Sequence, residues 1–251
     1  MRLKISDSEK IGDNLYVDLT KPIDLSIPLD EHPFAVNSFY APKFRSEPVK
    51  AGEFIGSVRQ GGPVNFRNVF INPHGNGTHT ECVGHIASEP YTINQSLKQF
   101  AWWAELISIK PLEAGPDKII TLELIQEALG EKRADALIIR TLPFDLNKKR
   151  MQWSGSNPPY LEAEAASWLV EIGVQHLLLD LPSVDREEDG GRLAAHKAFW
   201  TYPSSPRENA TITEMIFVPE EVEDGKYLLH FQITSMEIDA SPSKPVIYKV
   251  S

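Results

Sequence analysis

The chain has 251 residues, of which 41% are hydrophobic and 24% charged, a composition typical of a soluble globular protein. Its 35 acidic and 25 basic side chains give a formal net charge of −10, which argues against a surface that neutralises nucleic-acid phosphates. The single cysteine excludes an intrachain disulfide, and neither a signal peptide nor an apolar run long enough to span a membrane is found. We therefore expect a cytoplasmic protein with no nucleic-acid or membrane partner.

The first half of the chain predicts short strands and loops. Several segments are rich in β-branched and aromatic residues, and a Gly-Gly-Pro turn at 61–63 separates two of them. The predicted extended segments are residues 15–19, 34–40, 54–59, 64–71 and the apolar run 102–109.

The second half changes to an alternation of helices and strands. Thr121 can cap a helix over residues 122–129, which Gly130 would end. A helical apolar spacing over 161–172 lies between two apolar strands, 135–140 and 174–181, and this order implies a parallel pair of strands. The remaining predicted elements are a helix at 193–200 and strands at 212–218, 227–234 and 246–250. We expect one mixed α/β domain over residues 1–251, with a β-rich first half.

Three of the seven histidines fall between residues 74 and 85. His79 and Glu81 are two residues apart, so in an extended segment they project from the same face. Gly75 and Gly77 permit a turn that brings His74 beside them. Imidazole and carboxylate groups are ligands of zinc and manganese, and without a cysteine ligand an open catalytic site is favoured over a closed structural one. The alternative is a hydrogen-bonded loop that holds no ion.

This stretch resembles the signature of the metal-dependent cyclase family, His-x-Gly-Thr-His-x-Asp-x-Pro-x-His. Residues 77–79 and His85 match it in register, and Glu81 stands at the aspartate position. Further similarities follow in the family's order. The opening motif of the family resembles residues 18–23, and its second signature resembles residues 180–185 with the later Ala195 and His196. The final acidic residue of the family pattern corresponds to Glu214.

Three departures from the pattern concern the same site. Two residues, rather than one, separate His74 from Gly77. Glu81 adds one methylene to the usual aspartate, and Val83 and Gly84 replace the usual proline and variable residue. The extra residue displaces His74 by one position from the family pattern.

The resemblance implies a swivelling β/β/α fold and a divalent metal site holding one or two ions, zinc or manganese. Matching the motifs residue by residue, His74, His79 and Glu81 would hold the first ion, and Glu81, His196 and Glu214 the second. His85 would be the catalytic acid or base that gives a proton to a leaving amine. A homo-oligomer is also expected by resemblance.

The activity implied by the resemblance is hydrolysis of a C–N bond in a small molecule. The best-known case is the conversion of N-formyl-L-kynurenine to L-kynurenine and formate in tryptophan catabolism by an arylformamidase. The alternatives are opening of a lactam or lactone, a cyclase reaction, or a binding protein that keeps the fold without catalysis.

Other residues near the motif have weaker claims. Cys82 is interpreted as a small buried side chain rather than a nucleophile. Trp102 and Trp103 either line an aromatic substrate pocket or belong to the core. By resemblance, the segment with Phe34, Phe39 and Tyr40 is a candidate cover for the site.

Overall fold

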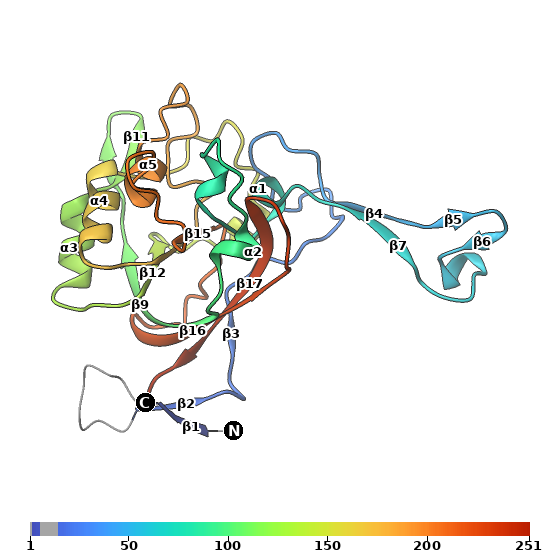
Figure 1. Ribbon diagram of the computed structural model, residues 1–251, viewed down its shortest axis with the longest axis horizontal. Helices are drawn as coiled ribbons and strands as arrows, with labels where there is room; N and C mark the ends of the chain where they lie inside the picture. The colour runs from blue at the N-terminus through green and yellow to red at the C-terminus, as the bar shows by residue number, and fades with distance from the viewer. Residues whose placement is uncertain (1, 6–14) are drawn as a thin grey trace.

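The computed structural model describes residues 2–5 and 15–251 (Figure 1). The strands of the main sheet are β3 (Ile23–Asp24), β8 (His79–Glu81), β9 (Ala101–Ile109), β12 (Ala136–Thr141), β14 (His176–Leu179), β15 (Thr211–Glu214), β16 (Gly225–Ile233) and β17 (Ala240–Lys249). The smaller sheets contain β1 (Arg2–Ile5), β2 (Leu15–Asp18), β4 (Arg45–Pro48), β5 (Lys50–Ala51), β6 (Phe54–Ile55), β7 (Arg67–Phe70), β10 (Leu112–Ala114), β11 (Asp117–Ile120) and β13 (Tyr160–Leu161). The helices are α1 (Pro73–Asn76), α2 (Ile93–Ser96), α3 (Leu122–Leu129), α4 (Ala163–Glu171) and α5 (Ala194–Trp200), with 3₁₀ turns η1 (Val58–Gln60), η2 (Val83–His85) and η3 (Leu146–Arg150).

The main sheet closes on itself. Its strand order is β16-β9-β12-β14-β15-β8-β17, and a further pairing of β17 with β16 joins the two ends. Strands β9, β12, β14 and β15 are parallel, whereas β8, β16 and β17 pair antiparallel with their neighbours. Strands from both halves of the chain therefore build one closed sheet, with β3 added to β17.

Alternate residues of each central strand feed two separate cores. In β12, Ala136 and Ile138 face a cluster inside the closed sheet, whereas Leu137 and Ile139 pack toward helices α3, α4 and α5. The helices cover one outer side of the sheet (Figure 1). Within the part of the chain that the structure describes, no helix has the length and apolar character needed to cross a bilayer.

The mixed α/β class and most of the predicted elements are confirmed. The Thr121 side chain accepts a hydrogen bond from the Leu124 N–H at the start of α3, and Gly130 follows its last residue. Strands β12 and β14 are parallel and α4 connects them, as the periodicity predicts.

The prediction of a strand over residues 34–40 is wrong. This segment is a loop with one isolated bridge, between Asn37 and Gln152. Phe39 and Tyr40 both have left-handed backbone conformations, with φ of 55° and 51°, which no strand allows. The Tyr40 N–H donates to the Ser154 hydroxyl instead of to a neighbouring strand.

A hairpin arm projects from the body of the molecule (Figure 1). It spans residues 45–70, with β4 paired to β7 near the body and β5 paired to β6 toward the tip. The predicted strand at 64–71 is confirmed for β7, whereas only the first two residues of the predicted 54–59 strand are extended and η1 follows them.

Candidate metal centre and active site

Strand β8 places a histidine and a glutamate at the centre of the site. His79 begins the strand and Glu81 ends it, and neither side chain is exposed to solvent. The strand lies between β15 and β17, so that Glu81 pairs with Ile212 on one side and Ala240 on the other. The backbone of Glu81 is therefore fixed from both sides.

The turn before β8 brings His74 back to Glu81. Asn72 caps the short helix α1 by accepting a hydrogen bond from the Gly75 N–H, and Gly77, at φ 153°, redirects the chain into β8. His74 Nδ1 lies 3.1 Å from Glu81 Oε2. The extra residue in this loop does not remove His74 from the cluster.

Helix α5 supplies His196 from the other side. Its Nδ1 lies 2.6 Å from Asp185 Oδ2, and Asp185 also accepts the N–H groups of Ala195 and His196 at the start of the helix. His196 Nε2 is 3.1 Å from Glu81 Oε1 and 3.9 Å from Glu214 Oε1. The segment 180–185, which resembles the family's second signature, thus contributes Asp185 as the group that orients His196.

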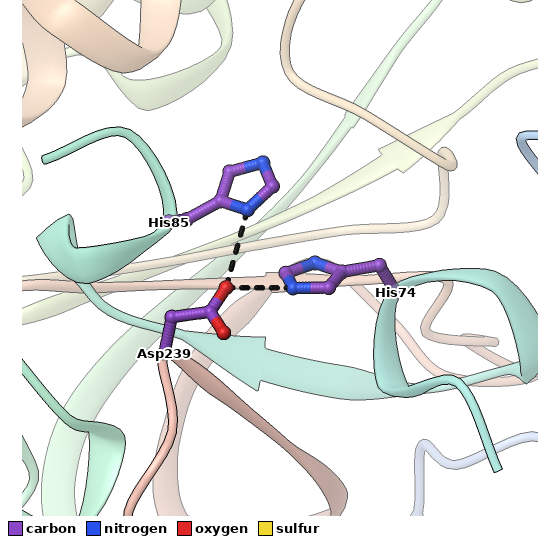
Figure 2. Close-up of side chains that lie close together, drawn as sticks. All are labelled: His74, His85 and Asp239. Carbon is purple, nitrogen blue, oxygen red and sulfur yellow. Dashed lines mark hydrogen bonds and ion pairs between the residues drawn. The ribbon is translucent and has the colours of Figure 1, made fainter. Parts of the chain in front are cut away.

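His85 and Asp239 complete the cluster (Figure 2). Asp239 Oδ2 lies 2.8 Å from His74 Nε2 and 3.3 Å from His85 Nδ1. His85 Nδ1 is also 3.7 Å from Glu81 Oε2. Sequence reasoning missed Asp239, since it stands outside every recognised motif, immediately before β17.

Three of the four imidazoles share one arrangement. One ring nitrogen faces an acceptor other than Glu81 and Glu214: Gly77 O for His79, Asp185 for His196 and Asp239 for His74. The other nitrogen faces Glu81 or Glu214. Metal-ligating histidines almost always have this arrangement, because the outer acceptor fixes the tautomer and the ring orientation.

Two buried atoms support a metal site directly. Among the described residues, His79 Nε2 and Glu81 Oε2 are fully buried and neither makes a well-aligned hydrogen bond. Leaving such lone pairs unused costs free energy, which a bound cation would offset. The ligand atoms of His74, His79 and Glu81 lie within 4.8 Å of one another, as do those of Glu81, His85 and His196 and those of His74, His85 and Asp239.

The carboxylates and imidazole rings of the cluster shift one another's pKa values toward their charged forms. Burial alone would lower the pKa of His74, but its hydrogen bond to Asp239 and the adjacent Glu81 raise it to about 10. Burial likewise opposes the charge on His196, yet Asp185 and Glu81 raise its pKa to about 10. The hydrogen bond from His74, and to a smaller extent that from His85, lowers the pKa of Asp239. A divalent cation would take the place of these ring protons as the positive charge of the site.

A cavity of about 460 Å³ opens onto this cluster. Its wall includes His74, His85, His196 and Glu214, together with Phe39 and Tyr40 from the loop. The charged residues Arg186, Glu187 and Asp189 also line it.

The aromatic expectations divide accordingly. Phe39 and Tyr40 line the cavity, whereas Phe34, Trp102 and Trp103 do not. Trp102 packs against the buried His176, with 4.4 Å between ring centroids, and Lys226 lies over Trp103. Cys82 is buried, as expected for a small core side chain.

The fold and the site together define a class of protein: a closed mixed α/β sheet that carries a histidine- and carboxylate-rich candidate metal centre. A family described as "putative cyclase" matches residues 17–186, and the chain belongs to this family.

The relatives are hydrolases by name. A kynurenine formamidase from Bacillus cytotoxicus is 28% identical over 190 residues, which cover 75% of this chain and 82% of the relative. A structure described as a potential metal-dependent hydrolase with cyclase activity has a TM-score of 0.66 at 16% identity, covering 91% of this chain and 97% of that one. Isatin hydrolase A from Labrenzia aggregata, bound to benzyl benzoate, has a TM-score of 0.65 at 14% identity, covering 91% and 93%. These structural likenesses support the fold.

Proposed function

We propose that this protein is a metal-dependent hydrolase of C–N bonds in small aryl formamides, with N-formyl-L-kynurenine as its substrate. The observation that carries the proposal is the cluster of four histidines around buried Glu81, open to a cavity of about 460 Å³. Cavities of this size suit small-molecule ligands. The kynurenine formamidases among the relatives support the substrate class.

The residues fit a divalent ion. Buried imidazole nitrogens and carboxylate oxygens face one another, and the outer ring nitrogens of His196 and His74 are already held by Asp185 and Asp239. His74, His79 and Glu81 would hold one ion, and Glu81, His196 and Glu214 a second. A bound divalent ion would lower the pKa of water and polarise the carbonyl of the substrate.

His85 carries the proton in this proposal. Its Nδ1 is held by Asp239, and its ring lines the cavity, so that Nε2 is the atom available to substrate (Figure 2). In that position it would protonate the nitrogen that leaves when the formamide is cleaved. A positioned acid or base of this kind contributes about 10²- to 10⁴-fold to the rate.

The cavity also matches the rest of the proposed substrate. Phe39 and Tyr40 offer aromatic surface to an aryl ring. Arg186, Glu187 and Asp189 also line it and offer both signs of charge to the carboxylate and ammonium groups of an amino acid. A substrate with an aryl ring and an amino-acid group would use both sets of side chains.

The test is an activity screen of the protein loaded with zinc, with manganese and with no metal. The substrates are N-formyl-L-kynurenine, formanilide, which lacks the amino-acid group, and isatin, a cyclic amide. We expect metal-dependent hydrolysis of N-formyl-L-kynurenine with a lower KM than for formanilide. His85→Ala should keep its metal and lose about 10²- to 10⁴-fold in kcat; loss of metal from a folded variant would make His85 a ligand instead.

A second candidate is the opening of a cyclic amide, which the isatin hydrolase fold neighbours favour. Turnover of isatin in preference to both formamides would establish it. A protein without a stoichiometric transition metal and without activity after metal addition would instead be a binding protein on this fold.

A further inference from the structure

Asp239 stands where one carboxylate oxygen reaches two rings (Figure 2). Its Oδ2 is within hydrogen-bond distance of His74 Nε2 and His85 Nδ1. Its backbone is fixed too, because its carbonyl accepts the Cys82 N–H and the next residue, Ala240, pairs with Glu81. The carboxylate is thus anchored to the same strand that presents Glu81.

We propose that Asp239 is the positioning residue of both histidines, an inference that rests on the proposed function for the role of His85. By accepting from His74 Nε2, it leaves Nδ1 as the atom that faces Glu81 Oε2 at 3.1 Å. By accepting from His85 Nδ1, it turns Nε2 of that ring away from itself (Figure 2). One side chain therefore aligns a metal ligand and the proton donor.

The geometry favours positioning over direct coordination. Both ring nitrogens that face Asp239 converge on the same oxygen, and Asp239 is not part of the cavity wall. Asp185 has the same relation to His196, at 2.6 Å from its Nδ1. Outer carboxylates of this kind typically affect metal affinity by 10- to 100-fold.

The experiment compares Asp239→Ala and Asp239→Asn with Glu237→Gln. Glu237 is a suitable control because it lies two residues away and bonds only Thr92 and Asn94 among the described side chains. Metal-free protein is titrated with zinc against a competing chelator, and kcat and KM are then measured on zinc-saturated protein. Circular dichroism and Tm confirm folding.

We expect Asp239→Ala to weaken zinc binding by about 10- to 100-fold and to lower kcat, with KM within about twofold of the parent. Asp239→Asn keeps a carbonyl oxygen that accepts a ring N–H, so it should recover part of both losses. Glu237→Gln should match the parent.

Unchanged zinc affinity in folded Asp239→Ala overturns the proposal. Complete loss of zinc in both Asp239 variants also overturns it, because Asp239 would then be a ligand, as does a parent protein that binds neither zinc nor manganese. If the parent binds zinc but hydrolyses no formamide, the proposed function fails, whereas the affinity comparison still decides the role of Asp239 toward His74.

Discussion

Shortening Glu81 to aspartate tests whether the reach of this side chain holds the centre together. Glu81→Asp restores the residue usual in the family signature and keeps the charge. The two carboxylate oxygens of Glu81 each lie 3.1 Å from an imidazole nitrogen, one of His196 and one of His74. Removing a methylene withdraws the carboxylate by about 1.3 Å, since a C–C bond is about 1.5 Å long. Both contacts would then exceed about 4 Å, beyond hydrogen-bond distance.

The backbone cannot follow the shorter side chain. Glu81 is paired with Ile212 and Ala240 on its two sides, so a shift would break the ladders to β15 and β17. Metal-ligand distances tolerate only about ±0.2 Å. The carboxylate would be withdrawn by several times this tolerance, so Glu81→Asp should lower metal affinity by more than the about 10- to 100-fold that loss of an outer partner typically costs.

Isothermal titration calorimetry of metal-free protein with zinc and manganese measures this loss. Glu81→Gln is the matched control, because it keeps the reach and removes the charge. Both variants should bind metal more weakly than the parent. If folded Glu81→Asp binds zinc within twofold of the parent, the argument from side-chain reach is refuted.

Three further predictions follow from the same structure. His79→Ala should lose bound metal and activity together, measured by elemental analysis and turnover; full metal content would exclude His79 as a ligand. Tyr40→Ala should raise KM for N-formyl-L-kynurenine roughly two- to tenfold with little change in kcat, as expected for loss of one aromatic contact; an unchanged KM would place the substrate elsewhere. Burial, with Arg207 nearby, lowers the pKa of His176 to about 3. The stabilisation from this neutral ring is therefore fully present above about pH 6.5. As the pH falls toward 3, the free energy of unfolding should decrease by up to about 1.4 kcal/mol per pH unit. Urea unfolding between neutral and acidic pH should therefore show the stability of the parent falling toward that of His176→Asn, and parallel curves would contradict the assignment.

Local patterns in the sequence were sufficient for the elements whose bonds are local. The cap at Thr121 and the stop at Gly130 bound α3 as predicted, because helix ends depend on side chains a few residues away. The alternation around 135–181 predicted two parallel strands and their helix, since a buried strand and an amphipathic helix have different apolar periods. The loop at 34–40 failed because its aromatic residues suit a strand in isolation, while Ser154, far along the chain, holds it in a turn.

The candidate site divides in the same way. The spacing of His79 and Glu81, and the family motifs, were enough to select His74, His85, His196 and Glu214 as its members, because chemistry-bearing residue types recur at fixed offsets within the chain. Only the tertiary structure decided that Asp239 belongs with them, since it reaches His74 through the pairing of β17 with β8 across more than 150 residues of sequence. The sequence also did not determine that β16 and β17 close the sheet or that the arm is exposed. Pairing between distant strands depends on which surfaces remain to be buried once the local elements have formed.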